Sequence, residues 1–217
     1  MDITNASVKA VGDWEIEIRA VPYGSDSDNQ IFDAYTDYML DTFASPAVLY
    51  HHGVNPGKAG IQDKPIVIGQ TVSVEQRADG VWIRAMLDKT KDFARRVWEA
   101  AKKGIAVASS DSISHLARLD VAGKRIMYEK GRPGRIAVWP LAGVSLWDNV
   151  AENFRPASRN AIAMPAMKAI YRDAGLDFPD IDTGGGVVVV PDGNMERRAR
   201  MEKIQKQARE FLAHSKR

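Results

Sequence analysis

The feature that most constrains the fold is a pair of alternating apolar and polar segments joined by a short turn. Residues 66–76 read IVIGQTVSVEQ, residues 81–88 read VWIRAMLD, and the turn residues ADG lie between them. Alternation with a period of two places the apolar side chains on one face of a strand. A glycine-containing turn between two such runs is typical of a β-hairpin. The chain is therefore predicted to contain an antiparallel sheet with one buried face.

Further segments extend this sheet and add one clear helix. Strands are predicted at residues 14–20, 48–52, 105–119, 124–129 and 135–147. Residues 91–103 carry apolar side chains at helical spacing, with Thr90 as the expected N-cap and Gly104 as the stop. The predicted fold class is α+β: a mostly antiparallel, β-barrel-like core with packed helices, followed by a helical C-terminal extension.

Three regions are expected along the chain. Residues 1–160 form the β-rich domain, residues 161–194 form a linker region that contains a short helix, and residues 195–217 form a basic amphipathic helix. From residue 196 to the end there are eight Lys/Arg and three Asp/Glu residues. Such a helix either caps the domain as a solvated element or binds a partner or a second copy of the chain.

The composition excludes several classes of site and partner. The 217 residues include no cysteine, which excludes disulfides, a thiol nucleophile and cysteine zinc sites. The net charge of +2 indicates no specific nucleic-acid partner, and no apolar run of about 18 residues predicts a membrane span. The histidines are not flanked by acids at metal-ligand spacing, so neither a metal nor a cofactor is expected.

Serine and histidine are the remaining candidates for catalysis. Ser109 and Ser110 stand side by side in the segment GIAVASSDSISHLAR, and His51 and His52 follow the strand VLY. A serine nucleophile needs a base within hydrogen-bond reach, and that base is usually a histidine. From the pattern alone, the histidines are better explained as structural residues at a strand end, and the serines as the polar end of a strand.

The order of the motifs resolves this ambiguity. The segments VLYHHG, IGQTVSVEQRADGVWIRAMLD, a helix ending in AAKKG, IAVASSDSISHLAR and GRIAVWPLAGVSL follow one another along the chain. In this order they resemble the prohead (capsid maturation) proteases of tailed bacteriophages, a serine endopeptidase family distantly related in fold to the herpesvirus assemblins. The resemblance covers about residues 12–160.

The resemblance implies roles for particular residues. The family's histidine matches His52, which directly precedes a glycine, with His51 as the fallback. The family's Ser-x-Gly pattern matches Ser109 as nucleophile, with Asp111 in place of the glycine and Ser110 as a competitor.

One position departs from the family pattern. The glutamate of Glu-x-Ser-Leu is replaced by Gly143, and His115, Asp111 and Asp148 are the residues that could orient the histidine instead. An inactive homologue with a structural or scaffold-binding role is therefore the alternative function. A β-barrel binding module, with the serines far from His52, is a third.

The resemblance also implies a setting. The enzyme would cleave scaffold protein, the scaffolding segment of the major capsid protein and itself. It would act in the host cytoplasm, inside the viral procapsid, with self-association as a further possibility. The basic tail would recruit it into the shell and then be trimmed at the linker.

Overall fold

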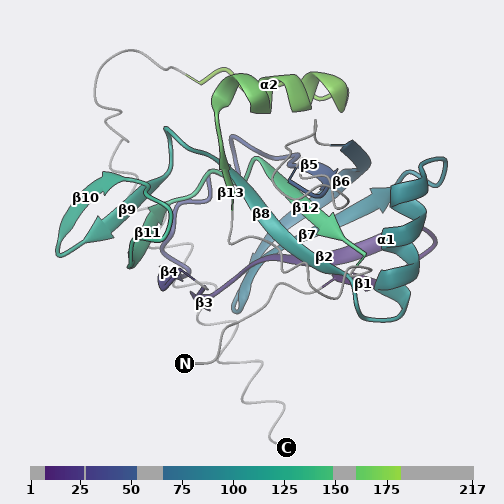
Figure 1. Ribbon diagram of the computed structural model, residues 1–217, viewed down its shortest axis with the longest axis horizontal. Helices are drawn as coiled ribbons and strands as arrows, with labels where there is room; N and C mark the ends of the chain where they lie inside the picture. Colours follow the sequence, from purple (N-terminus) through teal and green to yellow (C-terminus); the bar gives the residue numbers. More distant parts are fainter. Residues whose placement is uncertain (1–7, 27, 53–65, 149–159, 182–217) are drawn as a thin grey trace, which may run out of the picture.

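The computed structural model describes residues 8–26, 28–52, 66–148 and 160–181, and the following account is confined to them. The chain folds as a mixed α+β structure, mostly sheet, with two helices (Figure 1). Its elements are, in order, β1 (Val8–Ala10), β2 (Glu15–Pro22), β3 (Gly24–Ser25), β4 (Gln30–Phe32), β5 (Ala47–Tyr50), β6 (Ile66–Arg77), β7 (Gly80–Leu87), α1 (Asp92–Lys102), β8 (Val107–Ile113), β9 (Arg118–Val121), β10 (Lys124–Met127), β11 (Gly134–Val138), β12 (Gly143–Trp147), β13 (Asn160–Ile162) and α2 (Met164–Asp173).

The larger sheet has eight strands in the order β1-β2-β7-β6-β5-β12-β8-β13. Most of its pairings are antiparallel, while β5 with β12 and β8 with β13 are parallel. The sheet curls into a half-barrel, so that β2 approaches β8 although the two are not neighbours in the strand order. The barrel-like core expected from the alternating segments is therefore present as a curled sheet.

The smaller sheet, in the order β10-β9-β11-β4-β3, projects from one end of the molecule (Figure 1). It is joined to the larger sheet by the segment Trp139–Ala142, which separates β11 from β12. The Trp139 ring is fully buried and packs edge-to-face against Phe32 of β4, with a centroid separation of 5.4 Å. The two sheets thus share one buried aromatic junction.

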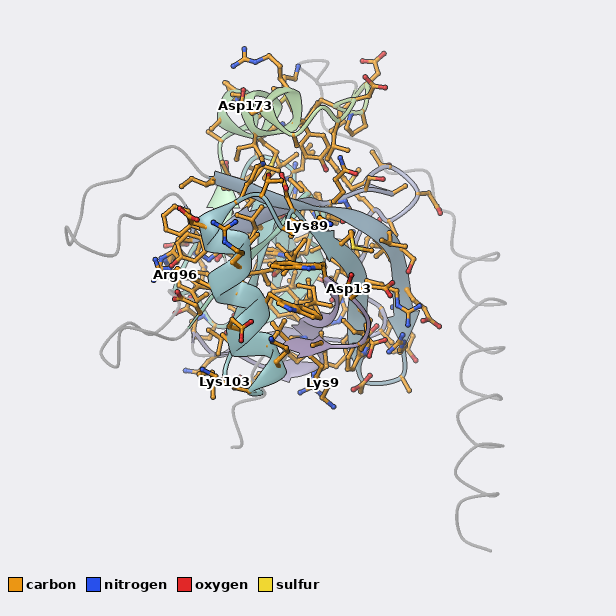
Figure 2. All side chains as sticks on the ribbon, turned by 90° about the vertical axis from the view of Figure 1, so that its right-hand side faces the viewer. Lys9, Asp13, Lys89, Arg96, Lys103 and Asp173 are labelled. Carbon is orange, nitrogen blue, oxygen red and sulfur yellow. The ribbon has the colours of Figure 1, made fainter. Side chains whose placement is uncertain are left out.

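Two apolar cores lie on opposite faces of the larger sheet. The inner core fills the concave side, where Ile16, Ile83 and Val144 are fully buried and α1 contributes Ala94 and Val97. Figure 2 shows α1 across one side of the curled sheet, with Arg96 and Lys103 along it. This helix is confirmed where the sequence predicts it, although Lys91, and not Thr90, is the N-cap.

The outer core lies between the sheet and α2. It is formed by outward-facing side chains of β5 and β8 together with buried side chains of α2, among them Leu49, Ile113, Met167, Ile170 and Tyr171. Figure 1 shows α2 lying over the strands β5, β12, β8 and β13. The region predicted as a linker from residue 161 therefore begins with the end of β13, which pairs with β8, and continues with a helix that is packed on the domain.

Three predicted strands have different bounds in the structure. The segment 105–119 is divided, because the chain turns at residues 114–116 between β8 and β9, and 135–147 is divided at the aromatic junction. The strand predicted at 48–52 ends at Tyr50, because His51 has a positive φ of 50° that a strand cannot contain. The predicted C-terminal helix, residues 195–217, lies outside the described residues.

Candidate active site

Polar side chains gather on the outer face of the strand pair β8 and β12. In the antiparallel register Asp111 lies opposite Gly143, Ser109 opposite Ser145, and Val107 opposite Trp147. Directly opposed residues project to the same face, and residues two apart on one strand also share that face. Ser109 and Asp111 therefore project from the same side of β8, toward the side on which Ser145 lies.

His52 reaches this face from the turn that follows β5. Its Nδ1 lies 2.6 Å from Oδ1 of Asp111, and both side chains are almost completely buried. An ionised carboxylate can only accept a hydrogen bond, so beside it Nδ1 carries the proton. In the neutral imidazole, Nε2 then keeps a lone pair and can act as a general base.

Two contacts fix the position of the His52 imidazole. One end is bound to Asp111, and the ring also contacts the Trp147 indole, with a centroid separation of 4.8 Å. Between Asp111 and Val107, which lies opposite Trp147, the next residue on this face of β8 is Ser109. Ser109 is therefore the β8 residue that lies, on this face, between the strand positions of the two residues contacted by the imidazole.

Ser109 and His52 each retain one buried polar atom that can still form a hydrogen bond. Within the part of the chain that the structure describes, neither Oγ of Ser109 nor Nε2 of His52 has a hydrogen-bond partner. Buried polar atoms are normally paired, and exceptions are often found at sites with a chemical role. These two atoms are the donor and the acceptor that a serine nucleophile and its base would use.

Ser110 occupies the other face of β8. Its side chain is fully buried on the side of the inner core, and its Oγ accepts a hydrogen bond of 3.1 Å from the Trp139 indole N–H. Its register partner is Val144, a residue of the inner core. The structure therefore brings Ser109, and not Ser110, to the face that carries Asp111 and His52.

His51 is held in a different environment from its neighbour. Its ring contacts Tyr50 and Trp147, with centroid separations of 4.2 and 5.3 Å. Burial lowers the pKa of His51 to about 4, although the nearby carboxylate of Asp148 opposes this shift. A left-handed backbone at His51 lets both histidines lie near Trp147, which regular strand alternation would not allow.

The other two residues considered for orienting the base have different contacts. The buried Asp148 accepts a hydrogen bond from the Tyr50 hydroxyl at 3.3 Å and forms an ion pair with Arg96 at 2.5 Å. His115 lies in the turn beyond β8, where burial, followed by the charge of Arg118, lowers its pKa. Of the three candidates, Asp111 is the residue that is hydrogen-bonded to His52.

Ser145 was not singled out by sequence reasoning. Its hydroxyl donates a hydrogen bond of 2.6 Å to Oδ2 of Asp111, so both carboxylate oxygens have a donor. The available signal was the Glu-x-Ser-Leu pattern, in which Ser145 takes the place of the serine, two residues after Gly143. The strand register needed to place it beside Asp111 is not contained in that spacing.

No group of three or more potential metal ligands is found among residues 8–26, 28–52, 66–148 and 160–181. In the same residues, no helix has the length and apolar character needed to cross a membrane. The outer face of β8 and β12 carries a serine, a carboxylate and the histidine that is hydrogen-bonded to this carboxylate.

Comparisons with family models, with curated proteins and with solved structures give no significant match to this chain. The resemblance to prohead proteases therefore remains a prediction, and the geometry of the site has to support any functional proposal.

Proposed function

We propose that the protein is a serine endopeptidase in which Ser109 is the nucleophile, His52 the general base and Asp111 the residue that orients the base. The observation that carries this proposal is the buried 2.6 Å contact between His52 Nδ1 and Asp111 Oδ1, on the face of the sheet that also bears Ser109. The inactive-homologue alternative rests on the absence of a carboxylate at Gly143, and Asp111 supplies one from the opposite strand.

The proposed reaction proceeds in two stages. Ser109 Oγ attacks the carbonyl carbon of the scissile peptide bond while its proton passes to His52 Nε2, and His52 then gives this proton to the departing amine. A water molecule attacks the resulting ester and loses a proton to His52. The bond to Ser109 Oγ then breaks, His52 returns the proton to this oxygen, and the carboxylic acid leaves. Asp111 remains ionised throughout and stabilises the imidazolium that forms twice in the cycle.

The biological setting extends the same proposal. By its resemblance to prohead proteases, the enzyme acts inside the viral procapsid in the host cytoplasm. Its substrates there are scaffold protein, the scaffolding segment of the major capsid protein and its own chain. The basic amphipathic sequence pattern of residues 195–217 supports recruitment or self-association through this segment.

The proposed nucleophile can be tested without knowledge of the natural substrate. Purified wild-type protein is treated with a fluorophosphonate, which reacts with activated serines, and the intact mass and the modified peptide are determined. We expect one adduct on Ser109 in the wild type and none in Ser109→Ala. In parallel, the intact mass of untreated protein over time reports self-cleavage.

Ser110→Ala is the matched control, because it removes a buried hydroxyl from the adjacent residue on the opposite face. We expect this variant to be modified on Ser109 at nearly the wild-type rate. Equal absence of modification and of cleavage in the wild type and both variants would refute the protease and favour the inactive homologue. An adduct on Ser110 would refute the assignment of Ser109.

A further inference from the structure

The Asp111 carboxylate accepts hydrogen bonds from the turn after β5 and from β12. His52 donates to Oδ1 and Ser145 of β12 donates to Oδ2, each over 2.6 Å, and neither Asp111 nor Ser145 is exposed to solvent. Hydrogen bonds to a charged acceptor are shorter and stronger than those between neutral groups. With one donor on each oxygen, rotation of the carboxylate away from His52 would break both bonds.

The position opposite Asp111 on β12 is occupied by Gly143, which has no side chain. A Cβ atom on Gly143 would lie 3.4 Å from the Cβ of Asp111, 3.7 Å from its Oδ2 and 3.2 Å from the carbonyl oxygen of Ala47. The contacts to Asp111 are ordinary van der Waals distances, and the contact to Ala47 is the tight one. Ser145 stands two residues after Gly143 on β12, so it projects from the same face of the sheet.

We propose that Ser145 is a positioning residue, which acts through Asp111 to keep the imidazole of His52 aligned with Ser109. This inference rests on the proposed serine endopeptidase. Ser145 itself does not contact the reacting atoms. Ser145 affects the orientation of the base. Removing its hydroxyl is therefore expected to change the rate of reaction at Ser109 more than the binding of a substrate or probe.

The test measures the rate at which Ser109 is phosphonylated. In this reaction the Oγ of Ser109 forms a bond to phosphorus, fluoride leaves, and the hydroxyl proton passes to His52. We expect Ser145→Ala to lower the maximal rate about 10- to 100-fold, with little change in the probe concentration that gives half-maximal rate. Ser145→Cys, which has nearly the same volume and a weaker donor, should give an intermediate rate.

Two comparisons separate positioning from a general structural effect. Thr36→Val removes another buried hydroxyl, which donates to the Ile136 carbonyl at 2.7 Å, and this variant should react at the wild-type rate. In an Asp111→Ala background, the change Ser145→Ala should have less than about a twofold effect, because the residue through which it acts is gone. Circular dichroism of each variant verifies that the fold is retained.

The possible results distinguish this inference from the function on which it rests. If Ser109 is modified equally fast in the wild type, Ser145→Ala and Ser145→Cys, the positioning role is refuted while the endopeptidase stands. If the effect of Ser145→Ala is equally large with and without Asp111, the role is again refuted. If the adduct lies on Ser145, or if the wild type is not modified at all, both proposals fail.

Discussion

The backbone conformation of His51 determines where the side chain of His52 lies. Its left-handed backbone, with φ of 50°, ends β5 and turns the chain so that His52 reaches the outer face of β12 and β8. Non-glycine residues adopt this conformation infrequently, and asparagine and aspartate tolerate it best. The imidazole of His51 is buried beside Asp148, Arg96 and His52, and burial is the main cause of its low pKa.

The low pKa of His51 predicts a pH-dependent stability. Its pKa is about 4 in the folded protein and 6.5 when unperturbed, so between these values the unfolded chain binds more protons. The free energy of unfolding should therefore fall as the pH is lowered from 6.5 to 4, by about 1–3 kcal/mol from this residue. Urea unfolding of the wild type at several pH values measures the fall.

His51→Asn provides the control for this measurement, because asparagine accepts the left-handed backbone and does not titrate. The difference in unfolding free energy between wild type and variant should change with pH across this range. A difference that is constant between pH 6.5 and 4 would contradict the assignment to His51.

For individual residues, the sequence was sufficient to identify the candidate side chains of the site but not their hydrogen-bond partners. Ser109 and His52 were named as candidates from the order of the motifs, and Asp111 as one of three residues that could orient His52. The choice between Ser109 and Ser110 depends on which face of β8 points outward. The choice of Asp111 depends on the turn at His51, which no local pattern predicts.

Helix α2 stabilises the strands that carry the site. Its Tyr171 hydroxyl donates to the carbonyl oxygen of Ala142 at 2.9 Å, directly before β12 begins. The Tyr171 ring also packs edge-to-face with Phe43 and Phe178, and burial raises its pKa. The helix is thereby fixed to the start of the strand that contains Gly143 and Ser145.

Tyr171→Phe tests this attachment. The substitution keeps the ring but removes the donor, so a buried carbonyl loses one partner, and we expect a loss of about 1–2 kcal/mol in the free energy of unfolding. Thermal or urea unfolding measures it. Tyr35→Phe, at a position that is 58% exposed, should change the stability little. Equal stabilities of the two variants would show that the hydroxyl contributes nothing.

The elements were predicted best where the periodicity is long and uninterrupted. The hairpin β6–β7 and the helix α1 lie where their patterns place them, because eight or more residues repeat one spacing. The turn after β8 and the junction between β11 and β12 were missed. Both breaks follow apolar residues that would also suit a continuing strand, so the sequence pattern does not mark them.

The two sheets meet around Trp139. Its indole contacts Phe32 and Tyr128 on the side of the smaller sheet and donates to Ser110 of β8 in the larger one. Since this residue is fully buried and belongs to the core inside the curled sheet, the two sheets are expected to unfold together.

Trp139→Ala is predicted to reduce the free energy of unfolding by about 3–5 kcal/mol, because it leaves a large cavity at the junction. Unfolding followed by both circular dichroism and hydrogen exchange should still show one transition for the wild type. Separate transitions for residues of the two sheets in the wild type would contradict a shared core.

The spacing of Ser109 and Asp111 on one strand has a consequence for the activity of chains that are not yet correctly folded. If β8 paired with β12 one residue out of register, every side chain would change faces. The outward positions would then be taken by Ala108 and Ser110, or by Ser110 and Ser112, and neither pair includes a carboxylate. On the proposed function, a misfolded chain would be harmless instead of wrongly active, so nascent copies would not digest their surroundings before the sheet is correctly assembled.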